Sequence, residues 1–259
     1  MLERLYQLPN LLILAIAVGG LVGVAMLAPY LGAKVFRLKP NRARDEAAFD
    51  AFKAVMAMAG FVLAFSLVQV NSNLRTVELA VAHEGNLLST VDRTLLRFGS
   101  PEAANARPLL ASFGSSLVSD EWPAMTHGER SMITEERYTA LSRTARAIEP
   151  TSQRQQTMFA ELLKALDDLS DGREALISDS EMRLPDFFWT MTGGFLALGL
   201  LLAVVSDANL TRAAALGANA AGIALLLAFV VIVDQPFKGQ TSVTPADIQK
   251  AIQINSRRI

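Results

Sequence analysis

The chain has 259 residues, of which 51% are hydrophobic, with a mean hydropathy of +0.31 and a formal net charge of −1. This near-neutral balance gives no reason to expect a nucleic-acid partner. The absence of cysteine excludes disulfides, thiolate metal sites and cysteine nucleophiles. The apolar residues gather in four blocks that carry almost no charge and are long enough to cross a bilayer as helices.

The first two blocks predict a membrane hairpin over residues 1–70. The first span covers about residues 8–30, and a basic stretch follows it instead of a small-x-small cleavage site. We therefore interpret it as a retained span and not as a signal peptide. The second span covers about residues 50–70, and its helix is expected to begin earlier, near Glu46.

Residues 71–185 predict a polar helical domain outside the membrane. This segment has twelve Lys and Arg residues and seventeen Asp and Glu residues, so it is mildly acidic. A helical apolar pattern extends the second span to about Phe98, where Gly99-Ser100-Pro101 ends it. The segment then predicts a bundle with helices over residues 102–119, 135–148 and 152–182, and a loop over residues 120–128.

The last two blocks predict a second membrane hairpin over residues 186–234. Its spans cover about residues 187–206 and 213–233, with a short polar link between them. The tail, residues 235–259, predicts one short helix with Thr244 as N-cap, Pro245 at its first position and Asp247 in its first turn. The fold class is therefore all-α, because the spans are too long and too evenly apolar for barrel strands.

Small residues recur at helical spacing in two spans, a pattern that lets helix backbones approach closely. We expect these residues to pack spans of one protomer together, with contacts between protomers as the alternative. The two stripes are Ala15, Gly19 and Gly23 in the first span, and Ala214, Ala218 and Gly222 in the fourth.

The distribution of basic residues predicts an orientation in the membrane. Loops rich in Lys and Arg face the cytoplasm, and the link between the first two spans is the most basic short loop. In a bacterial cytoplasmic (inner) membrane this favours the periplasmic side over the cytoplasmic side for the central domain. The basic residues of that link are Lys34, Arg37, Lys39, Arg42 and Arg44.

Three polar and aromatic motifs interrupt the generic helical pattern. They are Glu121-Trp122-Pro123, the run from Leu184 to Trp189, and the run from Asp234 to Gly239. Together with FVLAFSLVQ in the second span, they resemble the bestrophin-like domain family of bacterial membrane proteins over nearly the whole chain. Within these motifs we expect structural roles for Glu121, Trp122, Pro123, Asp234, Pro236 and Gly239.

The resemblance implies a homo-oligomeric ion channel of bestrophin type, passing small ions, with anions as the expected class. It implies five copies in the lipid bilayer, a pore lined by the second span, and a central domain and termini in the cytoplasm. Rings of apolar side chains can gate such a pore by dewetting, although Phe in a span also packs on lipid. The pore-lining candidates are Ala57, Phe61, Phe65, Ser66, Gln69 and Asn73.

The residues give no sign of catalysis. His83 and His127 are the two histidines, and neither lies in a metal-ligand or nucleophile pattern. We therefore expect no enzyme activity, no metal and no cofactor. The alternative function is a membrane-anchored sensor or scaffold that acts through its acidic helical domain. Its mass in detergent would separate the two hypotheses, because a monomer cannot surround a pore with four short spans.

Overall fold

The computed structural model describes residues 8–37 and 39–257, and all the regular structure within these residues is helical. The chain forms two compact units that share the long helix α2 (Arg42–Phe98). The first unit contains Met1–Ser72 and Arg183–Ser242, and the second contains Asn73–Met182 and Val243–Ile259.

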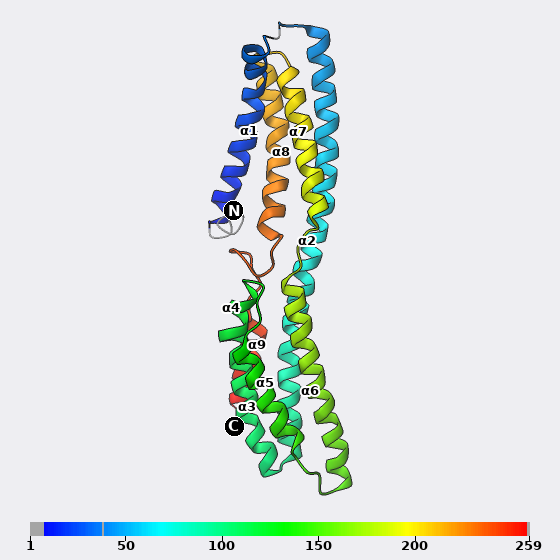
Figure 1. The fold of residues 1–259 in the computed structure, drawn as a ribbon, viewed down its shortest axis with the longest axis vertical. Helices are drawn as coiled ribbons and strands as arrows, with labels where there is room; N and C mark the ends of the chain where they lie inside the picture. The colour runs from blue at the N-terminus through cyan, green and yellow to red at the C-terminus, as the bar shows by residue number, and fades with distance from the viewer. Residues whose placement is uncertain (1–7, 38, 258–259) are drawn as a thin grey trace. The chain divides into compact units, whose positions relative to one another are not determined.

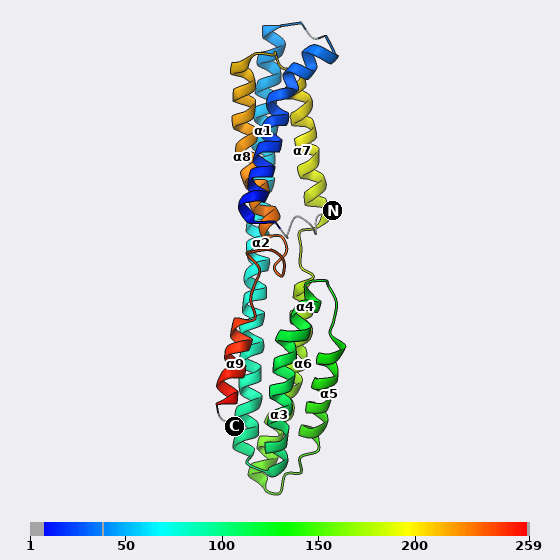
Figure 2. The ribbon, with the colours of Figure 1, turned by 90° about the vertical axis from the view of Figure 1, so that its left-hand side faces the viewer.

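The first unit consists of four helices that are long and apolar enough to cross a membrane (Figures 1 and 2). They are α1 (Asn10–Val35), the first part of α2, α7 (Asp186–Val205) and α8 (Leu210–Val233). The expectation of four such helices is confirmed. The ends differ by a few residues, most clearly in α1, which continues past Pro29 as far as Val35.

Helix α8 packs along α1 through small residues that are spaced three or four positions apart. A methyl group at Gly217 would lie 2.8 Å from Cγ of Met26, so the backbone of α8 is close to α1 there. The buried stripe of α8 includes Ala213, Gly217, Ala220, Ala224 and Ala228. On the other side of the unit, Gly32 of α1 lies directly against the backbone carbonyl of Val204.

The small-residue stripes that the sequence singled out are not the ones that pack the spans of this protomer together. A methyl group at Gly19, Gly23 or Gly222 would meet no atom within 4 Å, and Ala214 and Ala218 are exposed. The expectation of packing within one protomer is therefore wrong for these residues. The α8 stripe that does pack begins one residue earlier, about 100° away around the helix, and the spacing alone is the same for both.

Charged side chains tie together the two links at one end of the first unit. The Asp45 carboxylate accepts hydrogen bonds from the backbone N–H of Asp207, at 2.9 Å, and from Arg212, at 2.5 Å. Arg44 pairs with Asp207 at 2.7 Å, and the Arg212 guanidinium lies 4.1 Å from the ring centre of Phe49. The link between α1 and α2 is thus fixed to the link between α7 and α8.

The second unit contains the rest of α2 and a set of shorter helices (Figures 1 and 2). Serine side chains cap three of them: Ser100 accepts from Ala103 N–H, Ser131 from Thr134 N–H, and Ser152 from Gln155 N–H. The helices are α3 (Pro101–Ser116), the π-helix η2 (Leu117–Glu121), α4 (Trp122–Met125), α5 (Met132–Arg146), α6 (Gln153–Ser180) and α9 (Ala246–Ser256).

Two local expectations in this unit are wrong. Residues 120–125, expected as part of a loop, belong to η2 and α4, because the wide π turn directs Glu121 inward and Pro123 suits the first turn of a helix. Thr244 is not the N-cap of α9. The cap position is Pro245, which makes no side-chain hydrogen bond, and Asp247 lies in the first turn as expected.

Helix α9 lies against α2 and α3 at two glycines. A methyl group at Gly85 would lie 2.8 Å from the carbonyl oxygen of Asp247, and one at Gly114 would lie 3.1 Å from Cγ1 of Ile252. The Asn255 amide donates to the Leu88 carbonyl at 3.4 Å. The C-terminal helix is therefore an integral part of the second unit.

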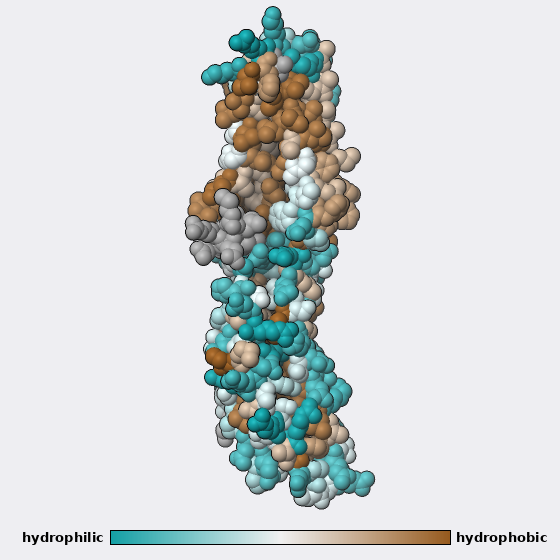
Figure 3. Space-filling model, in the orientation of Figure 1, coloured by the Kyte–Doolittle hydropathy of each residue, from teal (hydrophilic) through white to brown (hydrophobic). Residues whose placement is uncertain are grey.

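The surfaces of the two units differ in polarity (Figure 3). On the face shown in Figure 3 the first unit is mostly hydrophobic, with a hydrophilic cap at the end where α2 begins. The second unit has a mixed, mostly hydrophilic surface. This division is what a membrane-spanning unit and a water-exposed unit require.

Candidate functional site

The first part of α2 has one packed face and one exposed face. Phe52, Met56, Ala59 and Leu63 are buried, at the spacing of an α-helix that packs along one side. The opposite side carries large apolar side chains, among them Phe61 and Phe65, that the described part of the chain leaves exposed. It is this exposed side that contains most of the pore-lining candidates.

Ala57, Phe61, Phe65 and Gln69 form a row of exposed positions at a spacing of four residues. Phe61 is 64% exposed and Phe65 is 60% exposed. Their ring centres are 5.1 Å apart at an interplanar angle of 63°, an edge-to-face contact that holds the two rings together. The structure thus brings the two aromatic candidates together on an uncovered surface.

Asn73 and Ser66 occupy different positions relative to this row. Asn73 continues the spacing by one more step and is half-buried. Ser66 is buried, and its hydroxyl donates to the carbonyl of Val62 at 3.0 Å, within the same helix. Ser66 therefore lies on the packed face of α2, half a turn around the helix from Ala57.

The motif residue Glu121 belongs to a buried ion-pair network in the second unit. Its Oε2 accepts from Nε and Nη2 of Arg173, at 3.1 and 2.8 Å, and its Oε1 accepts from the N–H of Ser131 at 3.3 Å. Nη1 of Arg173 donates to Glu135 at 2.5 Å. Burial alone would lower the pKa of Arg173, but the bonds to Glu135 and Glu121 raise it.

Glu84 is a buried acid that sequence reasoning did not single out. Neither of its carboxyl oxygens has a hydrogen-bond partner, and the residue is fully buried. The sequence does contain a signal for it: Glu84 interrupts the apolar stripe of α2 that includes Val77, Val81 and Leu88. Arg173 interrupts the buried stripe of α6 in the same way, among Leu166, Leu169, Leu176 and Ile177.

Two of the sequence motifs meet at the ends of α7 and α8. The Asp234 carboxylate accepts the backbone N–H of Leu184 at 2.8 Å, just before α7 begins. Pro236 is buried, and Gly239 has a φ of 84°, which a residue with a side chain rarely adopts. In the remaining motif, Trp122 is half-buried and Pro123 is exposed. These positions are consistent with structural roles.

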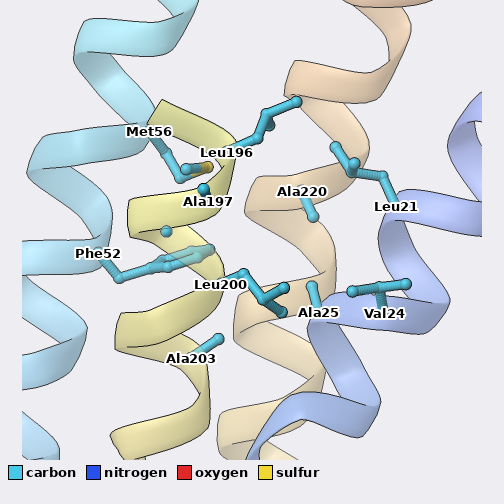
Figure 4. Close-up of a pocket in the computed structure, with 11 residues that line it drawn as sticks. Leu21, Val24, Ala25, Phe52, Met56, Leu196, Ala197, Leu200, Ala203 and Ala220 are labelled. Atoms are coloured by element: carbon cyan, nitrogen blue, oxygen red, sulfur yellow. The ribbon is translucent and has the colours of Figure 1, made fainter. Parts of the chain in front are cut away.

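The first unit also contains an apolar cavity of about 190 Å³ between its four helices (Figure 4). Leu21 and Val24 approach it from α1, Phe52 and Met56 from α2, and Leu200 from α7. Its lining offers no side chain that binds an ion or activates water. The cavity can therefore accept only an apolar group, and we assign it no role in ion passage.

No group of acidic or histidine side chains in residues 8–37 and 39–257 has the geometry to hold a metal ion. His127 is exposed, and its Nδ1 lies 3.0 Å from the carbonyl oxygen of Pro123. His83 is exposed on α2. The described residues thus present a surface row and a buried charge network as the two candidate sites.

These features define the class: an all-helical membrane protein in which one long helix is shared by an apolar unit and a polar unit. The family model of the Bestrophin-like domain matches residues 19–248. The chain therefore belongs to the Bestrophin-like domain family. No curated protein sequence matches it.

The fold is similar to that of a bacterial bestrophin homologue from Klebsiella pneumoniae, solved as single-substitution variants. One crystal structure matches with a TM-score of 0.55 at 14% identity, covering 95% of this chain and 98% of that chain. A second matches with a TM-score of 0.54 at 12% identity, covering 93% of this chain and 97% of that chain. At these identities the likeness shows a shared fold.

Proposed function

We propose that the protein is a homo-oligomeric channel for small ions in a bacterial membrane, with the exposed face of α2 lining the pore. The observation that carries this proposal is the uncovered Phe61–Phe65 pair, which is followed on the same helix by amide side chains. Rings of phenyl groups from several copies would form an apolar constriction that gates by dewetting. The family and the fold support the same class of protein.

The polar end of the row suits an ion that leaves such a constriction. Gln69 is exposed and Asn73 is half-buried, and an amide side chain offers both donors and acceptors. These groups can therefore replace part of the hydration shell of an anion or of a cation. Anions remain the expected class from the likeness to bestrophins. Ser66 is left out of the proposed lining, because its hydroxyl is bonded within the packed face.

The exposed small-residue stripes support the homo-oligomer. Gly19 and Gly23 on α1, and Ala218 and Gly222 on α8, form two smooth surfaces, and a methyl group at any of the three glycines would meet no described atom within 4 Å. In lipid such surfaces associate by close backbone approach. We propose that they join neighbouring copies, with five copies expected if the assembly is like that of bestrophins. The basic link that includes Arg42 favours a periplasmic second unit.

The experiment is ion flux from purified protein in liposomes. Phe61→Ala and Phe65→Ala should each raise the flux severalfold, because removing a phenyl ring widens the apolar constriction and a wider constriction dewets less readily. Phe187→Ala is the matched control, since Phe187 is 65% exposed on α7, outside the row and outside the two small-residue stripes. It should leave the flux unchanged. An absence of flux in all four proteins, at several salts and voltages, would contradict the proposal.

The mass of the protein in detergent gives an independent check. An assembly of several copies is expected, because one protomer cannot enclose a pore. A monomeric mass would overturn the channel and would favour the membrane-anchored sensor or scaffold that acts through the second unit.

A further inference from the structure

The second unit buries more acid than base at one point. Arg173 is the base at this point, and its Nε, Nη1 and Nη2 already donate to Glu121 and Glu135. Two carboxylates therefore share one guanidinium, and of these Glu121 is buried while Glu135 is about half exposed. A third acid, Glu84, lies next to this group with both oxygens buried and without a partner.

The backbone of α6 leaves room for Glu84 at a glycine. A methyl group at Gly172 would lie 2.6 Å from Oε2 of Glu84 and 2.8 Å from Cδ1 of Leu87. The carboxyl group is therefore pressed against α6 in an apolar setting, beside the residue that precedes Arg173. An ionised carboxylate in this place would have no water and no donor of its own, which is a strongly unfavourable state.

The charged groups around Glu84 come from several helices. Arg173 approaches from α6, Glu121 from η2, and Glu135 from α5 through its bond to Arg173. On α2 itself His83 is exposed, and on α9 the charged residue next to Gly85 is Asp247, whose side chain is about half exposed. No donor in this set is directed at the carboxyl group of Glu84 in the residues described.

We infer that Glu84 is a proton-binding site, and that its protonated form stabilises the packing of α2 against α6 at Gly172. In the neutral form the carboxyl group fits the apolar space. Loss of the proton leaves a buried anion beside a group in which two carboxylates already share one guanidinium. This state favours a local separation of the two helices, which lets water reach Glu84, or a movement of Arg173 away from one of its present partners.

The pKa of Glu84 agrees with this geometry. Burial raises it from 4.5 to about 8, while the charge of Arg173 lowers it and that of Glu121 raises it. Below pH 4.5 both the packed and the open states are protonated. Between 4.5 and about 8 only the packed state keeps the proton, so packing becomes weaker as the pH rises, by up to about tenfold in the opening equilibrium per pH unit. Above about 8 the dependence ends.

The experiment is hydrogen–deuterium exchange of the full-length protein in detergent, from roughly pH 5.5 to 9, corrected for the chemical exchange rate. The peptides of interest cover residues 77–91 and 166–177. In the wild type their local opening should increase by up to about tenfold per pH unit below about pH 8. Glu84→Gln cannot ionise, and its profile should be flat.

Two further variants keep the test decisive. Glu84→Met also lacks the proton and fills the space with an apolar side chain, so it should give the same flat profile even if Glu84→Gln is poorly folded. Glu78→Gln is the matched control, because Glu78 is exposed on the same helix. It should keep the wild-type profile. A wild-type profile in either Glu84 variant would overturn the inference.

Infrared spectroscopy of the wild type observes the proton directly. A carbonyl band of a protonated carboxylic acid should be present at neutral pH and should disappear with a midpoint near pH 8. The same band should be missing from Glu84→Met. A wild-type spectrum without such a titration would overturn the inference, whether or not the protein conducts ions.

Discussion

In the first unit small and apolar side chains fill most positions between the spans, and its buried carboxylates, Asp45 and Asp234, lie at helix ends. The second unit instead buries the carboxylate of Glu121 and the guanidinium of Arg173 between its helices. Among the glycines of the first unit, Gly32 and Gly199 make the closest approaches, to the Val204 carbonyl and to Cε of Met56. Those in the second include Arg173 with Glu121, and Gly172 with Glu84. The same chain therefore uses two different means of fixing neighbouring helices.

The surrounding solvent explains the difference. In lipid, burying an aliphatic side chain gains little, so helices associate by close contact between backbones. In water, burial of apolar stripes drives the second unit together, and the stability gained can tolerate a paired internal charge. Different substitutions should therefore destabilise the two units. Added side-chain volume should destabilise the first unit most, and removal of a buried charge should destabilise the second.

Gly32→Ala should give the largest effect on stability. Its new methyl group would overlap the backbone carbonyl of Val204, and backbone cannot move aside as a side chain can. We expect the free energy of unfolding to fall by more than about 3 kcal/mol, which is above the usual range for overpacking. The measurement is the yield and the thermal unfolding of the purified protein in detergent.

Gly19→Ala is the matched change in the same helix, where a methyl group meets open space. The protomer should be as stable as the wild type or slightly more stable, because alanine favours a helix over glycine. If Gly32→Ala and Gly19→Ala lost equal stability, the glycines of α1 would be required for backbone flexibility and not for close packing.

Arg173→Met should give the next largest effect. It leaves Glu121 buried without its partner, and breaking a buried pair from one side costs about 3–5 kcal/mol. The exposed pair between Arg130 and Glu174 is the comparison, since Arg130→Met should cost at most about 1 kcal/mol. Urea unfolding of the full-length variants measures both.

A combined variant sharpens this prediction. If Arg173→Met loses stability because Glu121 is left buried without its partner, adding Glu121→Gln should recover part of that stability. A loss of similar size in Arg130→Met, or no recovery in the double variant, would contradict the account of the buried network.

Periodic features were predictable from the sequence because they depend only on neighbours along the chain. The four apolar helices and the continuation of the second span to Phe98 follow from runs of residues with a single period. The exposed position of Phe61 and Phe65 follows from the same period once the packed face is known. Their proposed pore role depends on other copies of the chain.

Features that depend on distant partners were not predictable. The spacing of Ala214, Ala218 and Gly222 is the same as that of the stripe that packs, and only the position of α1 decides between them. Glu121 is separated from Arg173 by 52 positions, so the pair is invisible along the chain. The turn that directs Glu121 inward is a π-helix, for which the local sequence has no strong signature.

The smallest predicted effect concerns how the helices begin. In the first unit α1 and α7 begin after Pro9 and Pro185, with no side-chain cap, whereas the second unit uses Ser100 to cap α3. Ser100→Ala should lower the free energy of unfolding by about 1 kcal/mol, because the N–H of Ala103 loses the side-chain oxygen that accepts its hydrogen bond. Urea unfolding measures the change.

Ser115→Ala tests whether this cost belongs to the cap and not to serine in general. Ser115 is exposed within the same helix, and its hydroxyl bonds to the carbonyl of Ala111, which is already an acceptor in the helix. Alanine at this position should be neutral or slightly stabilising, because it favours the helix interior. A loss of stability at Ser115 as large as that at Ser100 would show that the cost comes from replacing serine in this helix and not from losing the cap.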